Sequence, residues 1–117
     1  MVLAVVDDLM FSVKISAAAK ALNVPVAFER VPEAVVQRVR DERPSLVIFD
    51  LNSVRLRPIE TIVALKGDPA LAGIRTMGYV SHVQGDVIAA ARSAGCDEVL
   101  ARSAFSERLG TILSGAA

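Results

Sequence analysis

Short apolar runs alternate with amphipathic segments along the chain. The apolar runs occupy residues 2–6, 25–28, 45–50, 74–80 and 98–101. Continuous apolar runs of this length predict strands that are buried on both faces, as in a parallel sheet. The run at 74–80 fits this pattern least well because it contains Arg75 and Thr76. Five strands that alternate with five helical segments predict an α/β protein.

Residues with strong positional preferences mark the ends of the predicted helices. Pro32 and Pro58 suit the first turn of a helix. Ser81 lies three residues before Gln84, which is the spacing of a capping box, and Ser103 is a candidate cap for the last helix. We predict helices at residues 11–22, 32–40, 58–67, 81–94 and from 103 toward the C-terminus.

Each predicted helix carries apolar residues at three- and four-residue spacing, and these residues should face the sheet. The Met10-Phe11 pair near the start of the first helix is expected to pack in the core or to contact a partner. The predicted buried faces are Ile15, Ala18, Ala19 and Leu22; Val35, Val36 and Val39; Ile59, Ile62 and Val63; Val87, Ile88, Ala91 and Ala94; and Phe105, Leu109, Ile112 and Leu113.

Composition narrows the classes of protein that this pattern allows. With 117 residues, of which 53% are apolar, the chain is expected to form a single domain over residues 1–117. Thirteen basic residues balance thirteen acidic ones, so we predict neither a nucleic-acid nor a membrane partner. Cys96 is the only cysteine, which excludes an internal disulfide. No long apolar stretch or signal peptide is recognised, and a cytoplasmic location is expected.

Polar residues stand where four of the predicted strands end. Asp7 and Asp8 follow the first strand, Asp50 closes the third, Ser81 follows the fourth and Arg102 follows the fifth. The carboxyl ends of parallel strands share one edge of the sheet, where ligands bind in open α/β proteins. We therefore predict that these side chains meet in a functional site, although helix capping by Asp7 or Asp8 is an alternative.

Two further stretches of sequence point to a family. Residues 94–100 read AGCDEVL and residues 67–71 read GDPAL. Together with the acids, Ser81 and Arg102, they make the chain similar to CheY-like response-regulator receiver domains along nearly its whole length. The resemblance implies a doubly wound, flavodoxin-like (βα)5 fold with a five-stranded parallel sheet of order 2-1-3-4-5.

The resemblance also implies a role for each polar residue of the predicted site. Asp50 would be the phosphoacceptor and would form an aspartyl phosphate. Mg²⁺, which prefers oxygen ligands, would be held by Asp7, Asp8, Asp50 and the backbone carbonyl of Asn52. Ser81 would contact the phosphate. Arg102 stands where the family has a lysine that pairs with it.

Several positions depart from the receiver pattern. Arg102 carries a planar guanidinium in place of the compact ammonium of lysine, so it either binds the phosphate or locks Asp50 in an ion pair. Ser103 replaces the proline that usually follows. Val99 stands where receivers have an aromatic switch residue, so a switch would have to use Phe105 or Tyr79. The loop from Asn52 to Pro58 also differs, and its arginines would attract an anion.

Three functions stay open at this point. The first is a phosphorelay receiver in a two-component system, served by a histidine kinase or phosphotransfer protein and signalling to a downstream protein. The second is a phosphorylation-independent pseudo-receiver that binds proteins or dimerises. The third is a small Mg²⁺-dependent enzyme such as a phosphatase. The resemblance implies a homodimer or partner face on helix four, strand five and helix five, and no enzymatic activity beyond phosphorylation and dephosphorylation of Asp50 itself.

Overall fold

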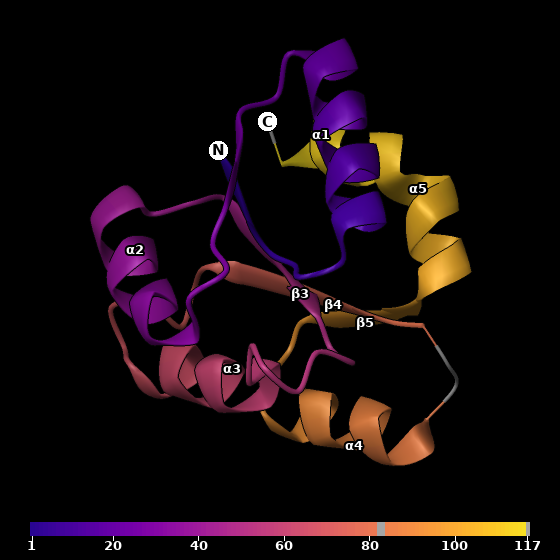
Figure 1. Cartoon of the computed structure of the whole chain (residues 1–117). Helices are drawn as coiled ribbons and strands as arrows, with labels where there is room; N and C mark the ends of the chain where they lie inside the picture. Colours follow the sequence, from indigo (N-terminus) through magenta and orange to yellow (C-terminus); the bar gives the residue numbers. More distant parts are fainter. Residues whose placement is uncertain (82–83, 117) are drawn as a thin grey trace.

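A computed structural model describes residues 1–81 and 84–116. Its centre is a sheet of five parallel strands in the order β2-β1-β3-β4-β5, which confirms the predicted doubly wound fold (Figure 1). The strands are β1 (Val2–Val5), β2 (Val26–Phe28), β3 (Leu46–Asp50), β4 (Arg75–Val80) and β5 (Glu98–Ala101).

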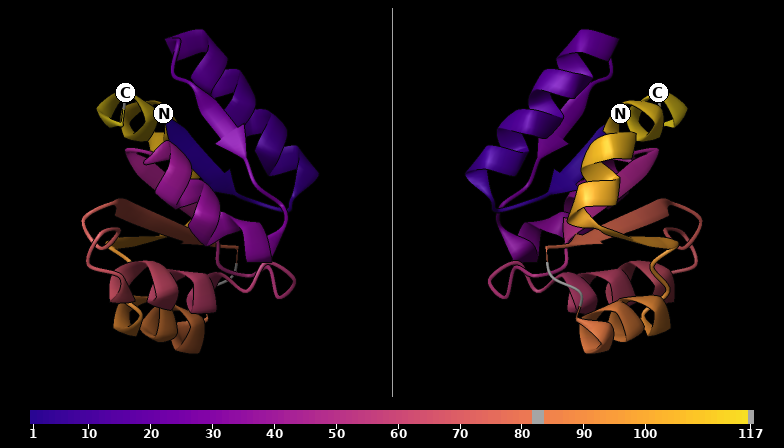
Figure 2. Two further views of the ribbon diagram at one scale, coloured as in Figure 1. Left: turned by 90° about the vertical axis from the view of Figure 1, so that its left-hand side faces the viewer. Right: turned by 90° about the vertical axis from the view of Figure 1, so that its right-hand side faces the viewer.

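Helices cover both faces of this sheet. They are α1 (Leu9–Leu22), α2 (Val35–Glu42), α3 (Pro58–Gly67), α4 (Gly85–Ser93) and α5 (Arg102–Gly115), and a 3₁₀ turn, Pro32–Ala34, precedes α2. α1 and α5 lie on one face, and α2, α3 and α4 lie on the other (Figure 2). Across residues 1–81 and 84–116, no helix combines the length and the apolar content that crossing a membrane requires.

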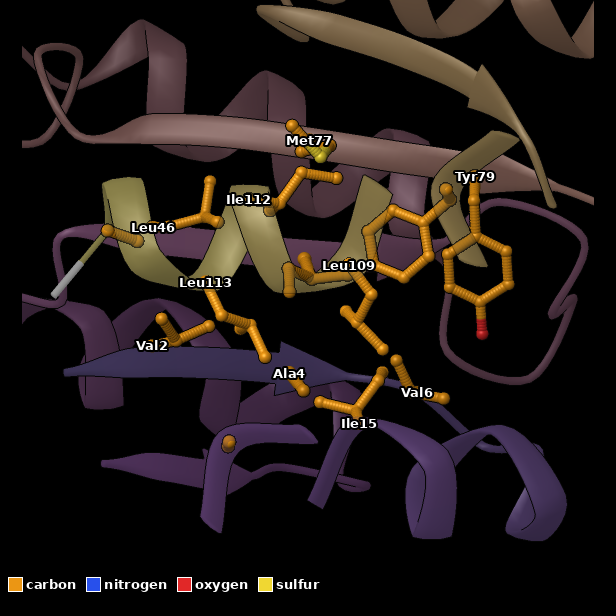
Figure 3. Packing of buried hydrophobic residues seen from close by; sticks show 14 of the residues in the cluster. Val2, Ala4, Val6, Ile15, Leu46, Met77, Tyr79, Leu109, Ile112 and Leu113 are labelled. Atoms are coloured by element: carbon orange, nitrogen blue, oxygen red, sulfur yellow. The ribbon is translucent and has the colours of Figure 1, made fainter. Parts of the chain in front are cut away.

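The sheet separates two hydrophobic cores. In β1, Ala4 packs toward α1 and α5 whereas Leu3 and Val5 pack toward α2 and α3, because successive side chains of a strand point to opposite faces. β3 divides in the same way between Ile48 and Phe49. The unbroken apolar runs of the sequence are thereby explained, since both faces of each central strand are covered. Figure 3 shows the core beneath α1 and α5.

The predicted helix faces are mostly confirmed. All four residues predicted for α5 are buried: Phe105, Leu109, Ile112 and Leu113. Two predictions were wrong. Val63 is 54% exposed because Ile62 and Leu65 face the sheet and Val63 lies on the side of α3 turned to solvent. Leu22 is 41% exposed, since it is the last residue of α1 and the chain reverses at Asn23.

Three predicted helix starts also need correction. α1 begins at Leu9, two residues early, because Asp8 caps it by accepting a hydrogen bond from the Phe11 N–H. α5 begins at Arg102, directly after β5, so Ser103 lies inside the helix and does not cap it. α4 follows Gln84, so the capping box at Ser81 is wrong, and His82 of that motif lies outside the described residues.

Gly78 in the middle of β4 lets the chain segment after β3 approach closely. A Cβ atom at this position would lie 2.5 Å from Cδ1 and 2.7 Å from Cγ of Leu51. Real Cβ atoms do not come this near to another carbon, because dispersion contacts have their optimum near 3.5–4.0 Å. The Leu51 N–H donates to the carbonyl of Tyr79, 3.0 Å away. The missing side chain therefore leaves room for Leu51 to pack against β4 just after Asp50.

Candidate functional site

Asp50 occupies the carboxyl end of the central strand and is 9% exposed. One of its carboxylate oxygens accepts a hydrogen bond from the Asn52 N–H at 3.1 Å. Burial raises the pKa of Asp50, and the negative charges of Asp8 and Asp7 raise it further, whereas the Asn52 N–H and Arg102 act in the opposite direction. Asp50 is thus a carboxylate held in one orientation at the edge where the site was predicted.

Asp8 pairs with Arg102 across the sheet edge. The Arg102 Nη2 lies 2.6 Å from the Asp8 Oδ2, and the guanidinium carbon lies 4.6 Å from the centre of the Phe11 ring. The aromatic face attracts the cation and holds it over the start of α1. Arg102 therefore forms its ion pair with Asp8 and not with Asp50. Asp8 takes the guanidinium instead because the starts of α1 and α5 adjoin.

Asp7 is paired as well, by an arginine that the sequence analysis had not assigned to it. Arg55 donates from Nε to Oδ2 at 3.0 Å and from Nη2 to Oδ1 at 2.8 Å. These hydrogen bonds lower the pKa of Asp7 below its usual value. The loop after β3 was expected to attract an anion through its arginines. That anion is Asp7 of the same chain.

Ser81 and Asn52 join the ends of β4 and β3. The N–H and the hydroxyl of Ser81 both donate to the Asn52 Oδ1, at 2.5 and 2.9 Å. The side-chain amide of Asn52 donates in turn to Gln84, 3.1 Å away. Sequence analysis had given Asn52 a role only through its backbone carbonyl. Its side chain instead joins Ser81 to the loop that follows Asp50, so Ser81 lies at the predicted edge.

Tyr79 is a residue of this region that sequence analysis left without a contact. Its side chain is 1% exposed, and its hydroxyl has no hydrogen-bond partner among the described residues. The ring packs 4.7 Å from Phe11 and 5.0 Å from Phe105, measured between ring centres. Figure 3 shows the hydroxyl pointing toward Val6, at the end of β1. Burial, with a further contribution from the charge of Asp50, raises the pKa of Tyr79 far above its usual value.

Alkaline titration should reveal this environment directly, because Tyr79 is the only tyrosine and the chain has no tryptophan. Free tyrosine ionises near pH 10. We expect the tyrosinate absorbance to stay absent at that pH and to develop only as the protein unfolds. Because burial raises the pKa of Tyr79 in the folded state, the stability that its neutral side chain contributes is fully present below about pH 10. That stability is lost as the pH rises from there toward the folded-state pKa.

Tyr79→Phe is the matched variant for this titration. It removes a buried donor without a partner, so it should raise the free energy of unfolding by about 1 kcal/mol at neutral pH. Because the variant has no hydroxyl to ionise at this position, it should lose less stability than the wild type above pH 10. Ionisation of Tyr79 near pH 10 in protein whose circular dichroism is still native would contradict the prediction.

The oxygen donors at this edge suit a hard divalent cation. Asp7, Asp8, Asp50 and the Asn52 carbonyl offer carboxylate and carbonyl oxygens, which Mg²⁺ prefers. Among residues 1–81 and 84–116, however, no three carboxylate, histidine or cysteine side chains are arranged to hold a metal. Asp7 and Asp8 face Arg55 and Arg102 instead. A cation would have to replace these two arginines.

Solved structures of response regulators match the chain over nearly its whole length. The phosphorylated cyanobacterial phytochrome response regulator RcpA is 22% identical, with a TM-score of 0.81 over 97% of this chain and 88% of that one. The Mn²⁺-bound form of Rcp1 is 18% identical, with a TM-score of 0.81 over 97% and 91%. CheY4 of Vibrio cholerae is 16% identical, with a TM-score of 0.82 over 99% and 97%.

No model of a protein family and no curated protein matches the sequence. The structural likeness nevertheless defines the class of fold. The chain has the CheY-like fold of response-regulator receiver domains, as the sequence motifs had indicated. At the carboxyl edge of its sheet, Arg55 pairs with Asp7 and Arg102 pairs with Asp8.

Proposed function

We propose that the chain is a phosphorelay receiver module in which Asp50 accepts a phosphoryl group. The observation that carries the proposal is the contrast between the three acids at the sheet edge. Asp7 and Asp8 are each ion-paired, whereas Asp50 has no ion-pair partner in the described part of the chain and is oriented by the Asn52 N–H. A carboxylate without a competing cation is the one free to act as a nucleophile.

The proposed step is an in-line displacement at phosphorus. A carboxylate oxygen of Asp50 forms a bond to phosphorus as the bond to the donor's nitrogen or oxygen breaks, and the leaving group takes the electron pair. Mg²⁺, held by Asp7, Asp8, Asp50 and the Asn52 carbonyl, would neutralise charge on the phosphoryl oxygens. Ser81 would turn from Asn52 to the new phosphate, and Arg102 would turn to it from Asp8.

Two of the matching structures support this reading. RcpA was solved in its phosphorylated form and Rcp1 with bound Mn²⁺. By analogy, the donor would be a histidine kinase or phosphotransfer protein, and the output would be contact with a downstream protein, in a cytoplasmic setting. A homodimer through α4, β5 and α5 is part of the same analogy.

The two arginine pairs favour a second candidate, a pseudo-receiver that works without phosphorylation. Arg55 binds both oxygens of Asp7, and Arg102 binds Asp8 at 2.6 Å. Two guanidinium groups already supply the positive charge that a divalent cation would bring. In this case the chain would act as a protein-binding or dimerising unit, and Asp50 would stay unmodified.

Intact-mass measurement after incubation with acetyl phosphate distinguishes the two candidates. We expect the wild type to gain one phosphoryl group in the presence of Mg²⁺, and Asp50→Asn to gain none. Asp41→Asn, a change at an exposed acid of α2 far from the site, is the matched control and should be phosphorylated like the wild type.

A folded wild-type sample that gains no phosphoryl group would overturn the first candidate and favour the second. Arg102→Lys and Arg55→Ala would then test the cause. If the guanidinium groups block the site, these variants should gain the Mg²⁺-dependent phosphoryl group that the wild type lacks.

A further inference from the structure

A cavity of about 520 Å³ opens beside the acidic site, between the start of α1, the end of β4 and the start of α5. Its apolar lining includes Met10, Phe11 and Val80. Its volume lies within the range of small-molecule binding sites, about 300–1,000 Å³. The cavity borders the acidic site, with which it shares Ser81 and Arg102, but its lining does not include Asp50.

Charge distinguishes this cavity. Among the residues that the structure describes, its lining contains two cationic side chains, Lys14 and Arg102, and no carboxylate. The hydroxyls of Ser103 and Ser106, from the first turns of α5, add hydrogen-bond donors. Arg102 is also paired with Asp8, so Lys14 supplies a second positive charge to the cavity. Lys14 and the serine hydroxyls, together with the part of the Arg102 guanidinium that Asp8 does not engage, favour an anionic group.

A second cavity on the other face of the sheet provides an internal comparison. It measures about 540 Å³ and is lined by apolar residues of the β3–α3 loop, α3 and α4. Its lining includes the carboxylates of Glu60 and Asp86 as well as Arg57, which is paired with Glu33 and Glu60. The two cavities are thus alike in size and opposite in charge.

The apolar side of the first cavity suits the body of a ligand. Phe11 is held in place by the core and is only 4% exposed, so it offers a ligand no more than a small part of its ring. Met10 is 80% exposed and can move over whatever lies against Phe11. An anion made only of oxygen atoms would leave these side chains without a contact.

We propose that this cavity binds a small organic anion with one acidic group and an aromatic or aliphatic body. The acidic group lies between Lys14 and Arg102, within reach of the α5 serine hydroxyls. The body packs against Met10, at the edge of the Phe11 ring. The site goes beyond the proposed phosphoryl transfer and requires no modification of Asp50.

Two fluorescent dyes with the same ring system provide the test. One is 8-anilino-1-naphthalenesulfonate, an anion, and the other is N-phenyl-1-naphthylamine, which carries no charge. We expect the anionic dye to bind the folded wild type at one saturable site. Lys14→Glu should weaken its binding by about tenfold or more, equivalent to about 1.4 kcal/mol, and should change the binding of the uncharged dye much less.

Lys20→Glu is the matched control, because it makes the same charge change on α1 but does not line the cavity. It should bind the anionic dye like the wild type. Ser106→Leu fills the cavity with a larger side chain and should reduce binding of the anionic dye. Melting temperatures close to that of the wild type show that each variant is folded.

Nuclear magnetic resonance locates the bound dye. Shifts at the amides of Lys14, Ser103 and Ser106 support the proposal. Shifts confined to exposed Leu9 and Val13, or to α3 and α4, overturn it, as does equal binding by the two glutamate variants or an absence of saturable binding. Asp50→Asn should bind the dye unchanged, so a failure of phosphorylation and a failure of this site are distinguishable.

Discussion

Replacing Phe105 with alanine is expected to lower the free energy of unfolding by about 4 kcal/mol, the usual cost of truncating a fully buried phenylalanine. The ring is 0% exposed. It stacks on Tyr79 with 5.0 Å between ring centres and contacts Phe11 at 5.6 Å. Its loss leaves a cavity among these rings. Urea unfolding followed by circular dichroism measures the change.

Ser106→Ala is the matched control, since it alters the next residue of α5 outside the buried aromatic cluster. It should leave the free energy of unfolding nearly unchanged. Equal destabilisation by the two variants would mean that packing of the three rings does not set the effect.

Asp97→Ala should lower the free energy of unfolding by about 2 kcal/mol, because it removes the acceptor of three hydrogen bonds. The Asp97 Oδ2 accepts from the Thr76 N–H at 2.8 Å, the Thr76 hydroxyl at 3.0 Å and the Lys66 Nζ at 2.9 Å. Thr76 is 0% exposed, so its donors would lose their partner inside the protein. Urea unfolding of the two proteins measures the difference.

The effect of Asp97→Ala should depend on pH. Burial acts to raise the pKa of Asp97, but the hydrogen bonds from Lys66 and Thr76 outweigh it, and the net shift is downward. The stability that the ionised Asp97 carboxylate contributes is present above its unfolded-state pKa, which is near 4. It is lost as the pH falls through the pKa of Asp97 in the folded protein. The two proteins should therefore converge in acid. Asp41→Ala, at an exposed acid, should show neither effect. A constant difference at all pH values would contradict this account.

The fold could be predicted from sequence because its strongest signals are local. Unbroken apolar runs mark central strands whose two faces are both covered, and the burial of β1 and β3 bears this out. Helix starts were less predictable. Asp8 and Ser103 are both good capping residues, yet only Asp8 caps a helix, because β5 runs straight into α5 and places Ser103 beyond the first helical residue.

The position of the site was predictable, but its pairings were not. Parallel strands bring Asp8, Asp50 and Arg102 to one edge whatever their side chains do. Which arginine reaches which acid depends on loop paths that no short pattern encodes. Arg55 and Asp7 are 48 residues apart in sequence, and Arg102 and Asp8 are 94 apart. The unsatisfied hydroxyl of Tyr79 was missed for a similar reason, since in sequence it is simply one more strand residue.

The carboxylate of Asp8 has two tasks at once. One oxygen caps α1 through the Phe11 N–H, and the other holds Arg102 at the first residue of α5. A ligand or charge that moves the Asp8 carboxylate therefore loosens the first turn of α1 and also releases the start of α5 from Asp8. The two events are linked in equilibrium, so a change in charge at the sheet edge is transmitted to the ends of α1 and α5. The protection of the Phe11 amide against hydrogen exchange should therefore report whether Asp8 is in place at the sheet edge.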